Sequence, residues 1–153
     1  MQQKISPFFW FDGKAEEAMN FYVSIFKDSK VLNVNRMGDQ VLVVEFELLG
    51  QHFLGLNGGP MHAGFTEAIS FMIHCEDQAE VDYYWSNLTA DGGEESMCGW
   101  LKDKYGLSWQ VIPKQMNEIF GGEDREGAGR AIQAMMGMQK IIVQDLQNAY
   151  DGK

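Results

Sequence analysis

The sequence predicts an α+β fold in which two tandem βαβββ modules form a curved, mostly antiparallel sheet pocket, followed by C-terminal helices. Three observations support this prediction. Residues 5–57 show a strand, a helix and three strands, residues 68–113 repeat that order, and residues 114–153 carry helical patterns. A chain of 153 residues is within the usual range for one domain and can bury a sizeable core. We therefore expect one domain, 1–153, with these three parts.

The first module begins with an apolar and aromatic stretch at residues 5–11, which stops at the turn residues Asp12 and Gly13. Residues 14–26 then place apolar side chains three and four positions apart, which indicates an amphipathic helix starting near Asp12. Short turns separate the β-favouring runs that follow, and this arrangement is typical of an antiparallel meander. The predicted strands of the meander are residues 30–36, 40–48 and 52–56.

The second module starts after a glycine-rich loop at residues 57–66. Residues 68–75 predict a strand, and residues 77–90 predict a helix with Asp77 as its N-cap. Three short strands complete the repeat: residues 94–97, 100–102 and 107–112.

A faint sequence echo supports a duplication, because residues 50–54 match residues 106–110. Each sheet would be covered on its outer face by its own helix, so its inner face would need the other half as a shield. We therefore expect a small-molecule pocket between the halves.

Composition excludes some partners. The formal net charge is −10 and no Lys/Arg cluster is present, so nucleic acid is a poor partner. No apolar span approaches the roughly 20 residues that cross a bilayer, and no signal-peptide pattern occurs, so we expect no membrane partner and a cytoplasmic location. Cys75 and Cys98 fit no CxxC spacing and are predicted to be reduced thiols.

The tail also carries a signal of its own. Residues 123–136 and 143–150 have amphipathic helical patterns with methionines on the apolar side. Helices appended to such a domain cover a sheet or pack against a second subunit, and methionine suits either role.

A series of short motifs runs along nearly the whole chain in a fixed order. They are PFFWF at 7–11, AEEA at 15–18, FY at 21–22, EFE at 45–47, NGGP at 57–60, FTEAISF at 65–71, CEDQAEVD at 75–82, CGWLKD at 98–103 and GLSWQV at 106–111. As an ordered set they resemble the PhnB-like, demethylubiquinone methyltransferase-like branch of the vicinal oxygen chelate superfamily. That superfamily includes glyoxalases, bleomycin-resistance proteins and dioxygenases. The resemblance also implies a homodimer, since the family commonly dimerises.

The resemblance implies where a metal would lie. The superfamily's metal enzymes hold a divalent ion through His or Glu on the first and last strand of each half, and the matching positions are Pro7, Leu54, Ser70 and Gln110. None of these side chains is a good metal ligand, so we expect no metal there and no cofactor. Glu45 and His74 are weak candidates for a relocated divalent metal.

Strand alternation selects the side chains expected to face the pocket. His74 shares a face with Ser70 and Met72, and Phe9 shares one with Pro7, whereas the face of Trp100 and Lys102 is not assigned by the pattern. The pocket candidates are Phe9, Leu54, Ser70, Met72, His74, Trp100 and Gln110.

These observations favour a small-molecule-binding protein that lacks the usual metal site, and they leave open whether it is an enzyme. The alternative is a metal-dependent lyase, isomerase or dioxygenase with relocated ligands. A methyltransferase, as in the family label, is disfavoured because no glycine-rich turn follows the first strand of a parallel sheet. The ligand stays unidentified at this level.

Overall fold

The computed structural model describes residues 3–62 and 64–153, which fall into two compact units, residues 1–64 and 65–153. The boundary lies in the predicted glycine-rich loop, in which Ala63 is outside the described residues. Each unit is described by itself, and the pocket expected between the halves stays a prediction.

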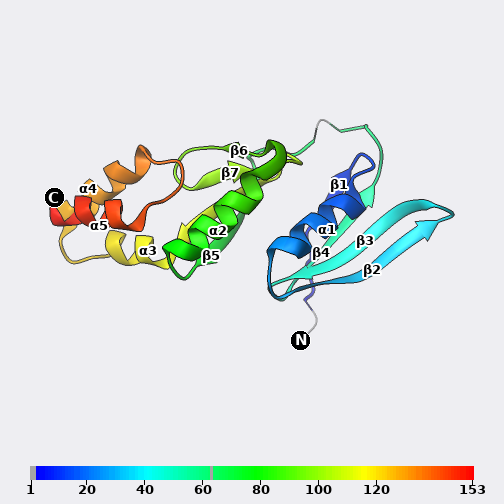
Figure 1. Ribbon diagram of the computed structural model, residues 1–153, viewed down its shortest axis with the longest axis horizontal. Coiled ribbons are helices and arrows are strands. Elements are labelled where there is room, and N and C mark those ends of the chain that lie inside the picture. The colour runs from blue at the N-terminus through cyan, green and yellow to red at the C-terminus, as the bar shows by residue number, and fades with distance from the viewer. Residues whose placement is uncertain (1–2, 63) are drawn as a thin grey trace. The chain divides into compact units, whose positions relative to one another are not determined.

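The first unit follows the predicted order of one strand, one helix and three strands (Figure 1). Its elements are β1 (Phe8–Phe11), α1 (Ala15–Ile25), β2 (Ser29–Met37), β3 (Gln40–Leu48) and β4 (Gln51–Asn57).

The second unit repeats this order and then continues into helices. Its elements are β5 (Phe71–Cys75), α2 (Gln78–Thr89), the 3-10 turn η1 (Ala90–Gly92), β6 (Glu94–Glu95), β7 (Trp100–Lys102), β8 (Ser108–Pro113), α3 (Lys114–Phe120), α4 (Arg125–Met136) and α5 (Val143–Asp151).

The two sheets share one topology. The strand orders are β1-β4-β3-β2 and β5-β8-β7-β6, with the first and last strand of each half parallel and the other pairs antiparallel. The register pairs Phe8 with Leu54 in the first sheet and Met72 with Gln110 in the second. The predicted α+β class and mostly antiparallel, duplicated βαβββ organisation are confirmed.

Each sheet buries one face under its helix. In the first unit Phe46 stacks on Phe53 at 5.5 Å between ring centroids and on Tyr22 of α1 at 6.2 Å. In the second unit Trp109 and Leu101 are buried on the side of the sheet that α2 covers, as is Trp85 of α2. Alternation therefore leaves the opposite side chains of each strand on a second, open face.

Several boundaries differ from the predicted ones: β5 begins at Phe71 rather than at residue 68, and β6 ends at Glu95 rather than at residue 97. Two further differences, in the first unit, have identifiable reasons. The first strand begins at Phe8 rather than at residue 5, since the ladder reaches Pro7 only through its carbonyl, which accepts from the Leu54 amide at 3.0 Å. Helix α1 does not begin on an Asp12 cap. Its Ala15 amide instead donates to the Asn57 side-chain oxygen at 2.9 Å, so the end of β4 caps the helix.

The C-terminal segment contains one helix more than the pattern indicated, because α3 follows β8 directly. Ile112 of β8 enters a buried cluster with four apolar side chains of the tail: Ile119, Ala131, Ile141 and Leu146. The Gln78 amide of α2 fastens this segment, since it donates to the Ile141 carbonyl at 2.9 Å and accepts from the Val143 amide at 2.8 Å. The tail thus covers one end of the second sheet.

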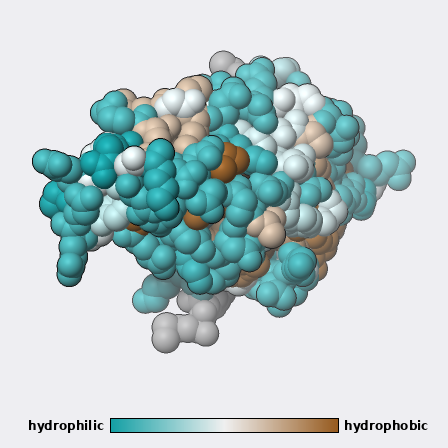
Figure 2. All heavy atoms as spheres, turned by 60° about the vertical axis from the view of Figure 1, so that its left-hand side comes forward, coloured by the Kyte–Doolittle hydropathy of each residue, from teal (hydrophilic) through white to brown (hydrophobic). Residues whose placement is uncertain are grey.

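Other expectations concern the surface and the thiols. Figure 2 shows a face on which hydrophilic side chains predominate and hydrophobic ones form small, separate patches. Cys75 and Cys98 are free thiols, as predicted. In the described residues no helix combines the length and apolar character needed to cross a membrane.

Candidate functional site

The open face of the first sheet is mainly apolar at its centre. Phe8 and Trp10 of β1 are 51% and 37% exposed, and they pair with Leu54 and Leu56 of β4. Trp10 donates through Nε1 to the Gly59 carbonyl at 2.9 Å, and a Cβ at Gly58 would lie only 2.2 Å from the indole. The NGGP loop therefore packs on Trp10, and only glycine allows this approach.

A polar cluster lies beside these residues on the same face. Ser6 Oγ is hydrogen-bonded to His52 Nδ1 at 2.7 Å, and His52 Nε2 lies 3.4 Å from Glu45 Oε2. The His52 and Glu45 side chains are about one-third exposed. Ser6 fixes the plane of the imidazole and leaves Nε2 directed at the carboxylate, so this pair can share a proton or a cation.

The open face of the second sheet is more polar. The Gln110 amide donates to Ser70 Oγ at 2.9 Å, and the register pairs Gln110 with both Met72 and Trp100. Lys102 lies on this face and forms an ion pair with Glu67 at 2.5 Å. The hydrogen bond with Glu67 raises the pKa of Lys102, and the same contact lowers the pKa of Glu67.

Most of the predicted pocket side chains lie on an open face. Leu54 does so in the first unit, and Met72, His74, Trp100 and Gln110 do so in the second. Ser70 precedes β5 and accepts a hydrogen bond from Gln110 on this face. The structure also assigns Trp100 and Lys102 to the same open face as Gln110, opposite the buried Leu101. These positions make them available for a ligand, and their role in binding stays a prediction.

Phe9 is an exception. It is buried, stacks on Phe53 at 5.8 Å and contacts Phe11 edge-on, so it belongs to the core beneath α1. The prediction that it faces the pocket is wrong, because the pairing of Phe8 with Leu54 places Phe8 and not Phe9 on the open face.

The superfamily's ligand positions lack metal-binding chemistry in this register too. Phe8 and Leu54 meet in the first unit, and Met72, Gln110 and Ser70 meet in the second. Over residues 3–62 and 64–153, no group of three or more His, Cys, Asp or Glu side chains is arranged to hold a metal ion. The donor set of these positions does not fit a divalent metal.

The two weak metal candidates lie in different units, Glu45 in the first and His74 in the second, and a shared site for them stays a prediction. Glu45 lies beside His52, and the contact of His52 with Ser6 was not predicted from the sequence. The signal for the contact between Glu45 and His52 is the antiparallel register. It sets Glu47 opposite His52 and places Glu45 two residues further along β3, on the same face.

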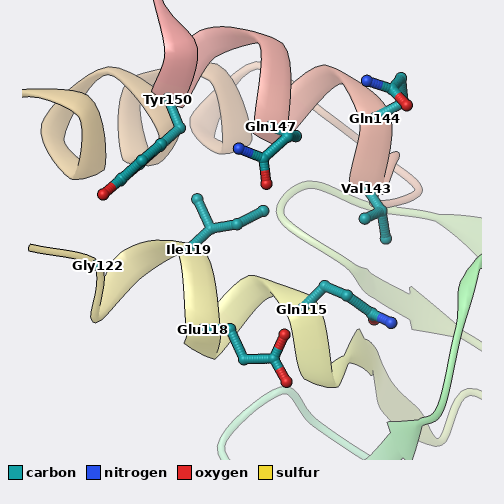
Figure 3. Close-up of a pocket in the computed structure, with 8 residues that line it drawn as sticks. All are labelled: Gln115, Glu118, Ile119, Gly122, Val143, Gln144, Gln147 and Tyr150. Carbon is teal, nitrogen blue, oxygen red and sulfur yellow. The ribbon is translucent and has the colours of Figure 1, made fainter. Parts of the chain in front are cut away.

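The described residues line hollows that include two candidate binding sites. One of about 440 Å³ lies in the first unit, where Glu16, Gln40 and Asn57 are among its lining residues. The other, of about 330 Å³, lies between α3 and α5 in the second unit (Figure 3).

Comparison with known proteins identifies the family. Residues 3–112 match the family model described as 3-demethylubiquinone-9 3-methyltransferase. The chain belongs to this family. The PhnB protein of Bacillus cereus has 37% sequence identity to the chain and a similar structure, with a TM-score of 0.67 over 72% of this chain and 99% of that one.

More distant structures share the fold of this 3-demethylubiquinone-9 3-methyltransferase family member. A Pseudomonas aeruginosa protein matches with 17% identity and a TM-score of 0.63, over 73% of this chain and 98% of that one. A glyoxylase/bleomycin resistance protein/dioxygenase domain from Frankia matches with 15% identity and a TM-score of 0.51, over 74% and 98%. The search of curated proteins finds no match. The vicinal oxygen chelate fold predicted from the motifs is confirmed, and the family match ends before α3.

Proposed function

We propose that this family member binds a small organic molecule on the open faces of its sheets, without the metal of related enzymes. The observation that carries the proposal is the set of side chains at the superfamily's ligand positions. They are apolar, hydroxyl or amide groups, which contact and hydrogen-bond organic molecules but coordinate divalent ions poorly. Trp100 beside Gln110 adds an aromatic surface to the hydrogen-bonding pair.

A fragment screen followed by ligand-observed NMR tests this proposal on the full chain. Binders should lose their signal changes in Gln110→Ala, which removes the amide beside Ser70, and keep them in Gln139→Ala, which changes an exposed loop residue. The proposal would be contradicted if the fragments showed the same signal changes with both variants. It would also be contradicted if the protein purified with stoichiometric zinc, nickel or iron.

A second candidate, a metal-dependent lyase, isomerase or dioxygenase, is favoured by the Ser6–His52–Glu45 cluster. A nitrogen and a carboxylate oxygen 3.4 Å apart have the separation of two ligands on one ion, and Ser6 orients the imidazole from its other side. His52 and Glu45 would hold the ion and leave its remaining positions open. Such an ion would polarise a substrate oxygen.

A thermal-shift titration with Mn²⁺, Ni²⁺ and Zn²⁺ separates the two candidates. The second predicts stabilisation that is lost in Glu45→Gln and His52→Gln and retained in His74→Gln, the matched histidine change in the other unit. If no ion raises the midpoint of thermal unfolding, or if the ions stabilise all three variants equally, the second candidate is wrong.

The methyltransferase activity in the family's name is not proposed for this chain. Methyltransferases that use S-adenosylmethionine commonly bind it at the carboxyl edge of a parallel, doubly wound sheet. In the described residues each sheet has a single parallel pair, so the open faces are the better-supported binding surface.

A further inference from the structure

The C-terminal groove is separate from the family-matched region, which ends at residue 112. It runs between α3 and α5, with Gln115 and Val143 at one end and Tyr150 and Gly122 at the other (Figure 3). Its volume of about 330 Å³ is at the lower limit of small-molecule pockets. The groove therefore has room for a small molecule.

The glutamines of the groove each use an amide donor within the chain and keep their amide oxygens as acceptors. The Nε2 groups of Gln115, Gln144 and Gln147 donate to the Glu76 carbonyl, to Asn148 and to Asp151, at 2.9, 3.0 and 3.0 Å. Their amide oxygens receive no hydrogen bond from the described part of the chain. In Figure 3 the Gln147 amide hangs from α5 towards Ile119, with its oxygen in the gap.

Among these amide oxygens, the one of Gln115 is buried, and it has no hydrogen-bond partner among the described residues. A buried acceptor without a donor destabilises the folded state. Such a group calls for an explanation, and a donor supplied by a ligand is one.

The negative charge of the groove also favours a ligand that donates hydrogen bonds. Glu118 lines it, is exposed, and forms no salt bridge within residues 3–62 and 64–153. Lys114, whose pKa is raised mainly by its hydrogen bond with Glu76 and also by Glu118, is bound to Glu76 at 2.5 Å. The groove therefore combines one carboxylate with several carbonyl acceptors over the apolar Ile119 and Val143.

We propose that the α3–α5 groove binds an aliphatic ammonium ion. An ammonium group has three donors and no acceptor, which complements the carboxylate of Glu118 and the oxygens of Gln115 and Gln147. Its methylene chain would lie against Ile119 and Val143. This site does not depend on the open sheet faces, so it and the proposed function can fail separately.

Isothermal titration of the full chain with 1,4-diaminobutane tests the proposal, with 1,4-butanediol as the neutral control at matched ionic strength. We expect saturable binding of the diamine with one site per chain and no binding of the diol. Absence of diamine binding, or equal binding of the diol, would overturn it.

Two pairs of variants distinguish binding in the groove from nonspecific electrostatic attraction to a chain of net charge −10. Glu118→Gln should weaken diamine binding by about three- to fivefold, the usual scale of an exposed ion pair, while the exposed Glu123→Gln should not change it. Gln147→Glu should strengthen binding by a similar factor and Gln139→Glu should not. Equal effects within either pair would refute the groove as the site.

Discussion

The two units share a strand order but differ in what covers their open faces. In the first unit Leu56, near the end of β4, is only partly buried, and it lies beside Trp10. In the second unit Ile112 occupies the equivalent position beside His74 and is buried by the tail. One topology therefore supports two surfaces, and the difference comes from residues appended after the last strand rather than from the sheets.

A matched pair of truncations measures this cover and should give the largest effect. Ile112→Ala is expected to lower the free energy of unfolding by about 3 kcal/mol, because it leaves a cavity among Ile119, Ile141 and Leu146. Leu56→Ala should cost about 1 kcal/mol, since its side chain is partly exposed. Urea denaturation measures both values. Equal losses would show that the tail adds no cover to the second sheet.

Helix capping gives the second comparison. Asn57 caps α1 from the end of β4 and also donates to the Val41 carbonyl at 3.1 Å, whereas Asp77 caps α2 locally by accepting from the Glu80 amide at 2.9 Å. We expect Asn57→Ala to cost about 2 kcal/mol and Asp77→Ala about 1 kcal/mol, because Asn57 loses two contacts.

Denaturant unfolding of both variants tests this order, with the exposed Asn35→Ala as the control for a neutral amide change. A larger loss in Asp77→Ala than in Asn57→Ala would contradict the idea that the long-range cap contributes more.

The thiols provide a third test, which depends on pH. Burial raises the pKa of Cys75 to about 12, whereas Cys98 is only partly buried. Iodoacetamide at pH 8 should therefore modify Cys98 within the native protein and leave Cys75 intact, as read by mass spectrometry.

The sign of the associated stability change follows from linkage. The unfolded Cys75 thiol ionises near its ordinary pKa of 9.0 and the folded one near 12, so its contribution is complete below pH 9 and is lost as pH rises through this window. Cys75→Ala should flatten the decline of the thermal midpoint there, and an unchanged decline would refute the assignment.

The smallest effect is expected at the surface ion pairs of the open faces. Lys30 pairs with Glu47 at 3.2 Å in the first unit, and Lys102 pairs with Glu67 at 2.5 Å in the second. Both are solvent-exposed, so Lys30→Met and Lys102→Met should each leave the unfolding midpoint within experimental error. A clear loss in one variant alone would show that its face is protected from solvent.

Much of the fold was predictable because its causes are local. Alternation in residues 40–48 predicted β3 with its observed bounds, and the apolar spacing after Asp12 predicted α1 within about a residue at each end. The short α3 was not predicted, since a seven-residue helix leaves a weak periodic signal.

The candidate site was predictable only in part, because it depends on register. The sequence indicated that Leu54, Ser70 and Gln110 would share the open faces, yet it assigned Phe9 to the wrong side and did not join Ser6 to His52. A shift of one residue between neighbouring strands reverses which side chains meet, and no local preference detects it.

The sequence by itself determined the order of elements, their amphipathic faces and the duplication, since each follows from side-chain preference and hydrophobic periodicity. The tertiary structure decided the Phe8–Leu54 register, the cap that Asn57 places on α1, the burial of Ile112 and the acceptor-lined groove between α3 and α5. These features join residues far apart in the chain, so they exist only once hydrogen bonding and packing have selected one pairing of the elements.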